Sequence, residues 1–424
     1  MASIPKRSQL LTSDKARILI ISNSYLPVVG GVQTVTHNLA RELIASGYEV
    51  RVVTNRYPVA LPARETVDGV TVDRLLFLTP DIDYLRRRRP DLFGASLVFG
   101  PRTYLKLRAI MRDFRPDVIN VHFPDHQTPF VLKLPREFDF RLVVSLHGHD
   151  IEGLLVGSTN GASRNSNHSK RSVKRLKSIL READAVTACS RDLLNKATEI
   201  ESSVCGKGEV IYNGVDQKRF LDKTSYSHPR PYILALGRLT YRKGFDMLLE
   251  AFAQHEATQS KPDLIIAGDG EEHDTLLAKV EQLGLTRSVH FVGNTTSQEV
   301  VRLLKSSVSV VVPSRSEAFG IVALEAVAAG KPVLATKTGG LGEFLFELNN
   351  AEAKNGARAI NQAHRGPCIL LVEPTVEGLA RGLREIFQLP RNGIAAANGY
   401  SLPDEYTWAH AARRYENVLS VVGQ

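Results

Sequence analysis

The sequence predicts an α/β protein with two doubly wound, Rossmann-like domains. Short apolar runs of strand length alternate with segments whose apolar residues recur at helical spacing. The runs are continuous rather than alternating, as expected for parallel strands that helices cover on both faces. The pattern starts afresh after a polar segment with two prolines, Asp222–Pro231. We therefore expect an N-terminal domain at residues 1–222, a second domain at 223–401 and a terminal helical segment at 402–424.

The first half opens with a strand–helix–strand unit. An aliphatic run at Arg17–Asn23 leads into a segment rich in proline and glycine, and Gln33–Ser46 then carries apolar residues at helical spacing. A second strand is expected at Glu49–Thr54. This order of elements implies a parallel sheet. Further elements expected in this half are strands at Val118–Val121, Leu142–Leu146 and Ala185–Ala188, and a helix at Val173–Glu182.

The second half repeats this organisation. The expected strands are Tyr232–Leu236, Asp263–Ala267, Val289–Val292, Ser309–Val312 and Pro332–Thr336. The expected helices are Phe245–Gln254, Thr275–Leu283, Gln298–Lys305 and Gly320–Ala329. Each half therefore holds a complete α/β system. A polar stretch, Asn349–Gly366, is predicted to be an exposed loop, and Leu402–Val422 a terminal helix.

The composition fits a globular protein of a reducing compartment. Hydrophobic residues make up 43% of the 424 residues and charged residues 23%. The three cysteines are too few for a disulfide framework, and none is in a CxxC pair. No apolar run approaches the roughly 20 residues of a membrane span, and the first residues have no apolar core typical of a secretory signal. We expect a cytoplasmic protein, with the cytosolic face of a membrane as one place of action.

The net charge of +9 lies entirely in the first half. Residues 1–222 carry 33 basic and 24 acidic side chains, whereas residues 223–424 carry 21 of each. Such an asymmetry suggests an anionic partner, either nucleic acid, an anionic membrane or a phosphorylated acceptor. An unevenly charged, solvated surface explains it equally well.

The most informative segment is Pro313–Gly330 (PSRSEAFGIVALEAVAAG). A strand ends at its start, and a helix is expected to begin near Phe319–Gly320. The unpaired amides of a helix start bind anions, and a glycine there lets a ligand approach the backbone. Glu317 precedes this start and Glu325 follows about two turns later, which suits a ligand with phosphates in the middle and hydroxyls at both ends. Alternatively, Glu317 caps the helix and Glu325 is an exposed helix residue.

A second segment, Gly237–Gly244 (GRLTYRKG), directly follows a strand. Its Arg238 and Lys243 lie at the carboxyl end of that strand, where open α/β sheets bind ligands. A guanidinium and an ammonium group at this spacing can hold a diphosphate and neutralise the charge that develops as it leaves. Two solvated surface cations are the alternative.

Two further segments follow strands of the first half. The pair Gly30 and Gly31 in PVVGG allows close approach of a sugar or phosphate, but the segment lacks the glycine pattern of a dinucleotide site. His147 and Asp150 close another strand in HGHD, and His122 and His126 follow the preceding one. These four side chains could ligate a metal ion, so a metal-dependent hydrolase is an alternative. The other interpretation is one functional histidine among polar loop residues.

A basic run lies at Tyr84–Pro90 (YLRRRRP) and is followed by aliphatic and aromatic residues. Basic residues beside apolar ones suit an anionic membrane surface, and a solvated charge run is the alternative. The four cations are Arg86, Arg87, Arg88 and Arg89. The nearby Asp81–Asp83 (DID) lies in a short loop without flanking strand residues and is not assigned a role. No recognised nucleic-acid motif occurs, so we expect no nucleic-acid partner.

Taken together, these segments resemble glycosyltransferase family 4, whose members have the GT-B architecture. The most specific feature is the E-x7-E pair Glu317 and Glu325, with GRLTYRKG about eighty residues upstream. The resemblance implies a nucleotide-diphospho-sugar donor, UDP- or GDP-linked, held mainly by the second domain. It also implies transfer with retention of anomeric configuration, no essential metal or other cofactor, and a terminal helix that packs on the first domain.

The resemblance also assigns roles to individual positions. Arg238 and Lys243 would bind the pyrophosphate, Glu317 the sugar hydroxyls and Glu325 the ribose. His147 would lie near the anomeric carbon. The remaining donor-side positions that it implies are Gly30, Gly31, the amides of Phe319, Gly320 and Ile321, and, near the base, Asn294 and Thr295.

The sequence thus predicts a retaining glycosyltransferase that moves a sugar to a hydroxyl acceptor. A soluble sugar and a lipid-linked or anionic acceptor are both compatible with it. The alternatives are a metal-dependent hydrolase using His122, His126, His147 and Asp150, and a non-enzymatic protein that binds anionic surfaces or nucleic acid.

Overall fold

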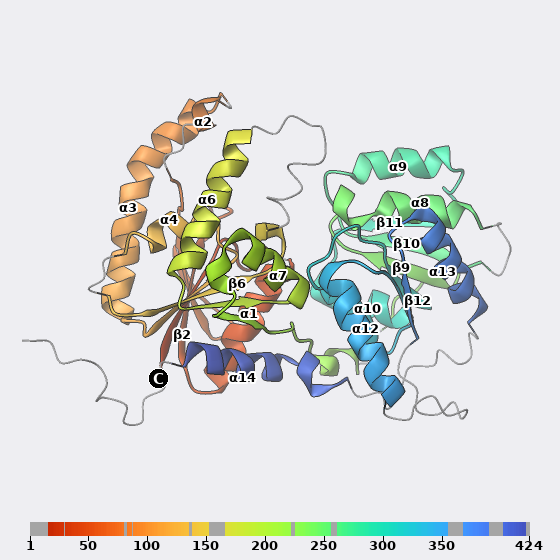
Figure 1. The fold of residues 1–424 in the computed structure, drawn as a ribbon. Helices are drawn as coiled ribbons and strands as arrows, with labels where there is room; N and C mark the ends of the chain where they lie inside the picture. Colours follow the sequence, from red (N-terminus) through yellow and green to blue (C-terminus); the bar gives the residue numbers. More distant parts are fainter. Residues whose placement is uncertain are drawn as a thin grey trace, which may run out of the picture. The chain divides into compact units, whose positions relative to one another are not determined.

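The computed structural model describes residues 16–28, 30–79, 83–86, 88–134, 138–151, 166–221, 225–255, 261–354, 368–389 and 402–420. The chain forms two compact units, each with its own sheet (Figure 1). Unit 1 holds the chain up to Cys189, then Leu193–Ile211 and the chain from Trp408 onward. Unit 2 holds Ser190–Asp192 and Tyr212–Thr407. The chain therefore passes from unit 1 to unit 2 mainly between Ile211 and Tyr212. The domain boundary expected from the sequence lies later, at the polar segment Asp222–Pro231.

Unit 1 is built on an eight-stranded sheet in the order β3-β4-β2-β1-β5-β6-β7-β8. All neighbours are parallel except β3 and β4, which form an antiparallel pair at the edge. Residues Ile18–Ile21 of the central strand are fully buried, as expected for a strand covered on both faces. The strands are β1 (Arg17–Ser22), β2 (Glu49–Asn55), β3 (Arg64–Val67), β4 (Val70–Leu75), β5 (Val118–His122), β6 (Arg141–Leu146), β7 (Ala185–Ala188) and β8 (Gly208–Val210).

Helices pack around this sheet. The last helix, α14, contacts α1 and β6, and its Trp408, Ala412 and Tyr415 are buried. It begins at Trp408 rather than at Leu402, because a 3-10 turn at Asp404–Tyr406 follows Pro403. The helices are α1 (Gly31–Ala45), α2 (Asp83–Arg86), α3 (Pro90–Phe114), α4 (Thr128–Val131), α6 (Ser166–Glu182), α7 (Arg191–Ile200) and α14 (Trp408–Leu419).

Unit 2 has a six-stranded, fully parallel sheet in the order β11-β10-β9-β12-β13-β14. Its strands are β9 (Tyr232–Leu236), β10 (Asp263–Ala267), β11 (Val289–Gly293), β12 (Ser309–Val312), β13 (Val333–Thr336) and β14 (Ile369–Val372). Its helices are α8 (Phe245–Ala253), α9 (His273–Gln282), α10 (Ser297–Ser306), α11 (Ile321–Ala328), α12 (Gly339–Lys354) and α13 (Val376–Gln388). Helices α8, α9 and α13 share an apolar core on one face, and α10 and α12 lie on the other (Figure 1).

The strand order reverses at one point in each sheet. In unit 2, β9 and β12 are neighbours although more than seventy residues separate them, and in unit 1 the same holds for β1 and β5. The connections after two such strands run to opposite faces, which leaves a crevice outside their carboxyl ends. A doubly wound sheet binds its ligand there, so the loops after β9 and β12 and those after β1 and β5 are where a site is expected.

Several elements differ from the sequence-based expectation. Helix α12 extends through 349–354, which the sequence predicted to be a loop, and α3 runs through Pro101, which lies three turns inside it. The elements that were not predicted are the strands β3, β4, β8 and β14 and the helices α2, α3, α4, α7, α12 and α13. Of the DID segment, Asp81 and Ile82 lie outside the described residues, and Asp83 begins α2. Among the helices of the described ranges, none combines the length and the apolar character that a bilayer-spanning helix needs.

Candidate functional site

The loop after β9 lies directly against the end of β12. A 3-10 turn at Tyr241–Lys243 leads to Gly244, whose φ of 68° places it in the left-handed region. A Cβ atom on Gly244 would lie 2.1 Å from the carbonyl oxygen of Pro313. Only glycine therefore permits this approach. It brings the end of the GRLTYRKG segment to the strand that precedes the E-x7-E motif.

Arg315 connects the loop after β12 to the loop after β9. Its guanidinium donates two hydrogen bonds of 2.7 Å to the carboxylate of Asp246 in the first turn of α8. It also donates to the carbonyl of Tyr241 at 2.8 Å and lies over that ring, 4.0 Å from its centroid. A bidentate arginine–carboxylate pair is geometrically specific. No sequence motif assigns a role to Arg315, because that role depends on a partner 69 residues away.

Lys243 and Glu317 meet at this junction. The ammonium Nζ of Lys243 forms a short hydrogen-bonded ion pair with Oε2 of Glu317, and the hydroxyl of Ser314 donates to the same oxygen at 3.3 Å. The Glu317 side chain is 15% exposed and that of Lys243 31%, so both can reach a ligand. Glu317 does not cap α11, because Gly320 occupies the N-cap position without a side-chain bond. The alternative of a capping glutamate is therefore wrong.

The amino end of α11 presents backbone rather than side chains. The ring of Phe319 is buried and stacks on Phe344 at a centroid distance of 4.7 Å, so Phe319 can offer only its backbone to a ligand. Gly320 has a φ of 92°, and a Cβ atom there would lie 2.6 Å from Cδ1 of Leu341. The amides at the start of a helix have no partner within the helix, and the helix dipole favours an anion near them.

Glu325 lies in the second turn of α11 and is not a plain exposed residue. Its side chain is only 13% exposed, and its Oε1 lies 3.5 Å from Nη1 of Arg219. Burial raises the pKa of Glu325, and the nearby Arg219 guanidinium partly offsets this shift. Arg219 is itself held by the hydroxyl of Ser297, to which it donates at 2.6 Å. Sequence reasoning missed Arg219, since it stands in no motif.

Three further predicted residues lie at the same edge of the unit 2 sheet. Arg238 follows β9, is exposed, and its side chain makes no hydrogen bond or ion pair with any described residue. Asn294 and Thr295 follow β11, and the amide of Asn294 donates to Oδ2 of Asp269 at 3.3 Å. Asp269 follows β10. All three loops leave the carboxyl edge, which is the edge that carries Lys243 and Glu317.

In unit 1, the glycine pair marks the start of α1. Gly31 is the first residue of that helix, and the carbonyl of Gly30 accepts from the amide of Thr34 at 3.0 Å. With a φ of 176°, Gly30 has an extended backbone that any residue can adopt. A Cβ atom there would meet only the flexible side chain of Gln33, 2.6 Å away. Glycine is thus not required by the backbone conformation at this position, although a larger residue would need Gln33 to move.

His147 ends a chain of hydrogen bonds that crosses the carboxyl half of the unit 1 sheet. Its Nε2 lies 2.9 Å from Nδ1 of His122, whose Nε2 lies 2.9 Å from the amide nitrogen of Asn120. The Asn120 oxygen accepts from the hydroxyl of Ser145 at 2.9 Å. Thr187 continues the chain by donating to Ser145 at 2.9 Å, and it lies 3.2 Å from the hydroxyl of Tyr415 in α14.

This chain determines which histidine nitrogens carry protons. Since the Asn120 oxygen accepts from Ser145, its amide nitrogen donates to Nε2 of His122. His122 then carries its proton on Nδ1 and donates to Nε2 of His147, which leaves the proton of neutral His147 on Nδ1. Burial lowers the pKa of His147 to about 4 and that of His122 well below its ordinary value. His147 is therefore a neutral hydrogen-bond donor at pH 7.

Comparison with known proteins places this geometry in a family. The model of "Glycosyltransferase Family 4" matches residues 29–219, and that of "Glycosyl transferases group 1" matches residues 216–365. An uncharacterized glycosyltransferase of Methanocaldococcus jannaschii is 30% identical over 348 residues, which is 78% of this chain and 84% of the relative. The chain belongs to glycosyltransferase family 4. This confirms the family that the E-x7-E segment resembled.

Two further comparisons support the assignment of fold and class. A glycogen synthase of Mycobacterium tuberculosis is 29% identical over 408 residues, or 93% of this chain and 92% of the relative. The solved structure of Anabaena HepE in complex with UDP aligns with a TM-score of 0.64 at 18% identity, covering 95% of this chain and 99% of HepE. This likeness, like the two parallel sheets, shows the GT-B fold of a glycosyltransferase.

Membership of this family disfavours the metal-dependent hydrolase, and so does the geometry of its four candidate ligands. No three of these described residues bring ligand atoms within 4.8 Å of one another. His122 and His147 bond each other, and His126 lies 3.8 Å from Asp125. The carboxylate of Asp150 accepts from the amides of His147 and Gly148 at 3.0 and 2.7 Å, and burial raises its pKa to about 6. Asp150 thus shapes the loop that holds His147.

Only part of the basic run of this glycosyltransferase lies within the described residues. Arg87 and the side chain of Arg86 lie outside the described residues. Arg88 has a φ of 56°, and Arg89 donates to the carboxylate of Asp91 at 2.7 Å. Beyond them, α3 exposes apolar side chains to an unusual degree. Their exposed fractions are 53% for Leu97, 49% for Val98, 39% for Phe99 and 61% for Leu105.

Proposed function

We propose that this protein is a retaining glycosyltransferase that takes a sugar from a UDP- or GDP-sugar and passes it to a hydroxyl acceptor. The observation that carries the proposal is the junction of Lys243 and Glu317 beside the first amides of α11, at the reversal point of the unit 2 sheet. A cation, a carboxylate and a helix start thus lie together at the carboxyl edge of the sheet, where doubly wound folds bind ligands. The UDP complex of Anabaena HepE supports a nucleotide diphosphate as the donor's leaving part.

We propose that each donor-side residue meets one part of this ligand. Arg238 and Lys243, with the amides of Phe319–Ile321, hold the diphosphate, and Glu317 accepts hydrogen bonds from sugar hydroxyls. Glu325, kept in place by Arg219, accepts from the ribose. Asn294 and Thr295 lie on the side of the base. When the diphosphate leaves, two cations and a helix dipole stabilise the charge that it gains, so the proposed reaction needs no metal ion.

In unit 1, we propose that His147 and the turn at Gly30 and Gly31 act on the transferred sugar. Because neutral His147 presents an Nδ1–H group, it can donate to an oxygen of the sugar during transfer. The carboxylates near it are already bonded, Asp150 to two backbone amides and Asp125 to the amide of Asn23 at 3.1 Å. Neither is placed as a nucleophile. For a retaining transfer, these described carboxylates therefore favour reaction of acceptor and leaving phosphate on one face of the sugar over a covalent glycosyl–carboxylate intermediate.

The test is donor cleavage by the full chain, with water or added methanol as the acceptor. We expect release of UDP from UDP-glucose or of GDP from GDP-mannose. Nuclear magnetic resonance should show the methyl α-glycoside as the first product, because these donors are α-linked. A β-glycoside would contradict retention. Absence of cleavage together with absence of binding of both donors would contradict the transferase itself.

We further propose that the acceptor side of unit 1 works at an anionic membrane surface, where a lipid-linked acceptor would lie. Val98, Arg102 and Leu105 recur at helical spacing on α3, so an exposed stripe carries both apolar and basic side chains. Lys106 lies beside them and is also exposed. A small hollow lined by Phe123, His149 and Arg175 lies in the same unit and could receive the acceptor's polar end.

Flotation with phosphatidylcholine vesicles, with and without phosphatidylserine, tests this surface. We expect the wild type to float mainly with the anionic vesicles, and replacement of Leu97 and Leu105 by serine to reduce the bound fraction several-fold. Leu277→Ser is the matched control, because Leu277 is an exposed leucine (39%) on α9 of unit 2. Equal recovery with both vesicle types, or equal recovery of both variants, would refute the membrane role.

A further inference from the structure

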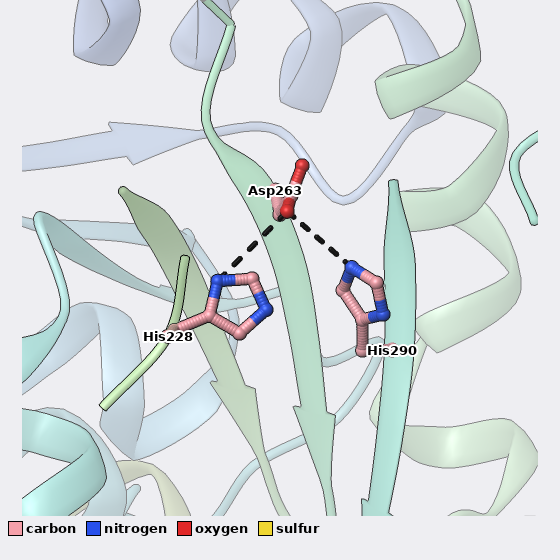
Figure 2. A group of neighbouring side chains, drawn as sticks. All are labelled: His228, Asp263 and His290. Atoms are coloured by element: carbon pink, nitrogen blue, oxygen red, sulfur yellow. Dashed lines mark hydrogen bonds and ion pairs between the residues drawn. The ribbon is translucent and has the colours of Figure 1, made fainter. Parts of the chain in front are cut away.

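A cluster of two histidines and an aspartate lies at the amino edge of the unit 2 sheet (Figure 2). Asp263 is the first residue of β10, His290 is the second residue of β11, and His228 stands in the segment that leads into β9. The donor-side residues lie at the opposite, carboxyl edge of the same parallel sheet. The cluster is therefore separate from the site proposed for the nucleotide sugar.

The three side chains converge on one carboxylate oxygen. Oδ2 of Asp263 lies 3.4 Å from Nε2 of His290 and 3.9 Å from Nδ1 of His228, and Figure 2 shows both rings turned toward it. All three ligand atoms lie within 4.8 Å of one another. In a tetrahedral zinc site with bonds near 2.0–2.1 Å, ligand atoms are about 3.3 Å apart. The observed separations thus need only small side-chain movements to accommodate an ion.

The carboxylate of Asp263 is deeply buried although one of its oxygens accepts no hydrogen bond from the described residues. Its side chain is 3% exposed, and its Oδ1 accepts no hydrogen bond from any described residue. Nη1 of Arg230 lies 3.3 Å from that oxygen, while Nη2 of the same guanidinium donates to the carbonyl of Lys261 at 2.6 Å. A buried charge is costly unless it is paired or coordinates a metal.

We propose that His228, Asp263 and His290 bind one divalent transition-metal ion, with Zn²⁺ as the best fit. Two imidazole nitrogens and one carboxylate oxygen form a set that suits zinc, and water completes the tetrahedron. His228 Nδ1 lies 2.9 Å from the carbonyl oxygen of Arg230 and 3.3 Å from its amide nitrogen. To bind the ion, Nδ1 must carry no proton and the ring must turn its lone pair away from this carbonyl. Mg²⁺, which prefers oxygen ligands, is not expected to bind.

The ion would tie the segment before β9 to the two strands beside it. His228 stands three residues before Pro231, whose carbonyl accepts from the amide of Asp263 at 2.9 Å. A metal bound only by the folded chain stabilises it. Its role is therefore structural, and sugar transfer at the other edge of the sheet does not depend on it.

The test uses the full chain after treatment with a chelator and desalting. Calorimetry should show one Zn²⁺ bound per chain, and Zn²⁺ should raise the melting temperature whereas Mg²⁺ should not. His290→Ala should weaken Zn²⁺ binding by about 100-fold or more, since losing even a hydrogen-bond partner of a metal ligand costs about 10–100-fold. His273→Ala is the matched control, since His273 lies in the same unit, pairs with Asp274, and should leave the affinity unchanged.

Cobalt provides a measurement that needs no variant. Co²⁺ bound to the wild type should show the intense visible absorption of a four-coordinate site, and Zn²⁺ should displace it at one equivalent. The proposal is overturned if the wild type binds no Zn²⁺ and gives no such cobalt spectrum. It is equally overturned if His290→Ala binds Zn²⁺ as tightly as His273→Ala, because the ion would then lie elsewhere.

Discussion

Replacing Lys243 by alanine should lower kcat/KM for donor cleavage by about 10²–10³-fold, which is the usual effect of removing one group that stabilises developing charge. Lys243 is paired with Glu317, which precedes Gly320, the N-cap residue of α11, by three positions. Without it, a diphosphate in the proposed site loses one of two cations, and among the described residues only the hydroxyl of Ser314 still donates to the Glu317 carboxylate. Initial rates of UDP or GDP release measure the effect.

Lys279→Ala is the matched control for this change. Lys279 forms an equally close pair with Glu250, but it lies on α9, away from the loops after β9 and β12. We expect it to retain wild-type kcat/KM and to cost at most about 1 kcal/mol of stability, as for a surface ion pair. If Lys243→Ala cleaves the donor as fast as Lys279→Ala, the assignment of the diphosphate site is wrong.

Gly244→Ala should destabilise the protein more than any other single alanine substitution discussed above and should remove activity with it. The left-handed backbone alone costs about 1–2 kcal/mol for a residue with a Cβ atom. The new atom would also lie 2.1 Å from the carbonyl oxygen of Pro313, so the loop must move away from β12. We expect a total loss of about 3 kcal/mol or more in the free energy of unfolding.

Gly284→Ala separates the two contributions. Gly284 has the same φ of 68°, but its Cβ position has nothing within 4 Å. Denaturant unfolding should show a loss of only about 1–2 kcal/mol for this variant, with normal donor cleavage. Equal losses for the two variants would mean that the contact between the β9 loop and Pro313 is not tight and that Lys243 is not held by it.

The strands of unit 2 illustrate what the sequence can predict. The bounds of β9, β10 and β12 coincide with the apolar runs, because a strand buried on both faces leaves a continuous signal in the chain. The edge pair β3 and β4 left no such signal, since β3 alternates between exposed and half-buried residues. Helix α12 starts with two glycines, of low helix propensity, and forms because the fold packs its Phe344 and Leu348 inside.

The candidate site was predictable where one segment carries its own chemistry. Glu317 and Lys243 stand in recognisable segments that directly follow strands, and the structure brings them together. Arg219 and Arg315 could not be found in this way, because each acts through a partner on a distant segment. The same holds for His228 and His290, whose meeting at Asp263 depends on the order of strands in the sheet.

The central claim is that unit 2 binds the diphosphate of a nucleotide sugar between Lys243 and the start of α11. Calorimetric titration of the wild type with UDP and GDP, and with their monophosphates, tests it most directly. We predict that one diphosphate binds at one per chain, at least tenfold more tightly than its monophosphate. Lys243→Ala should remove that preference and leave monophosphate binding unchanged. A diphosphate that binds no better than its monophosphate, or equally well to Lys243→Ala, would contradict the claim.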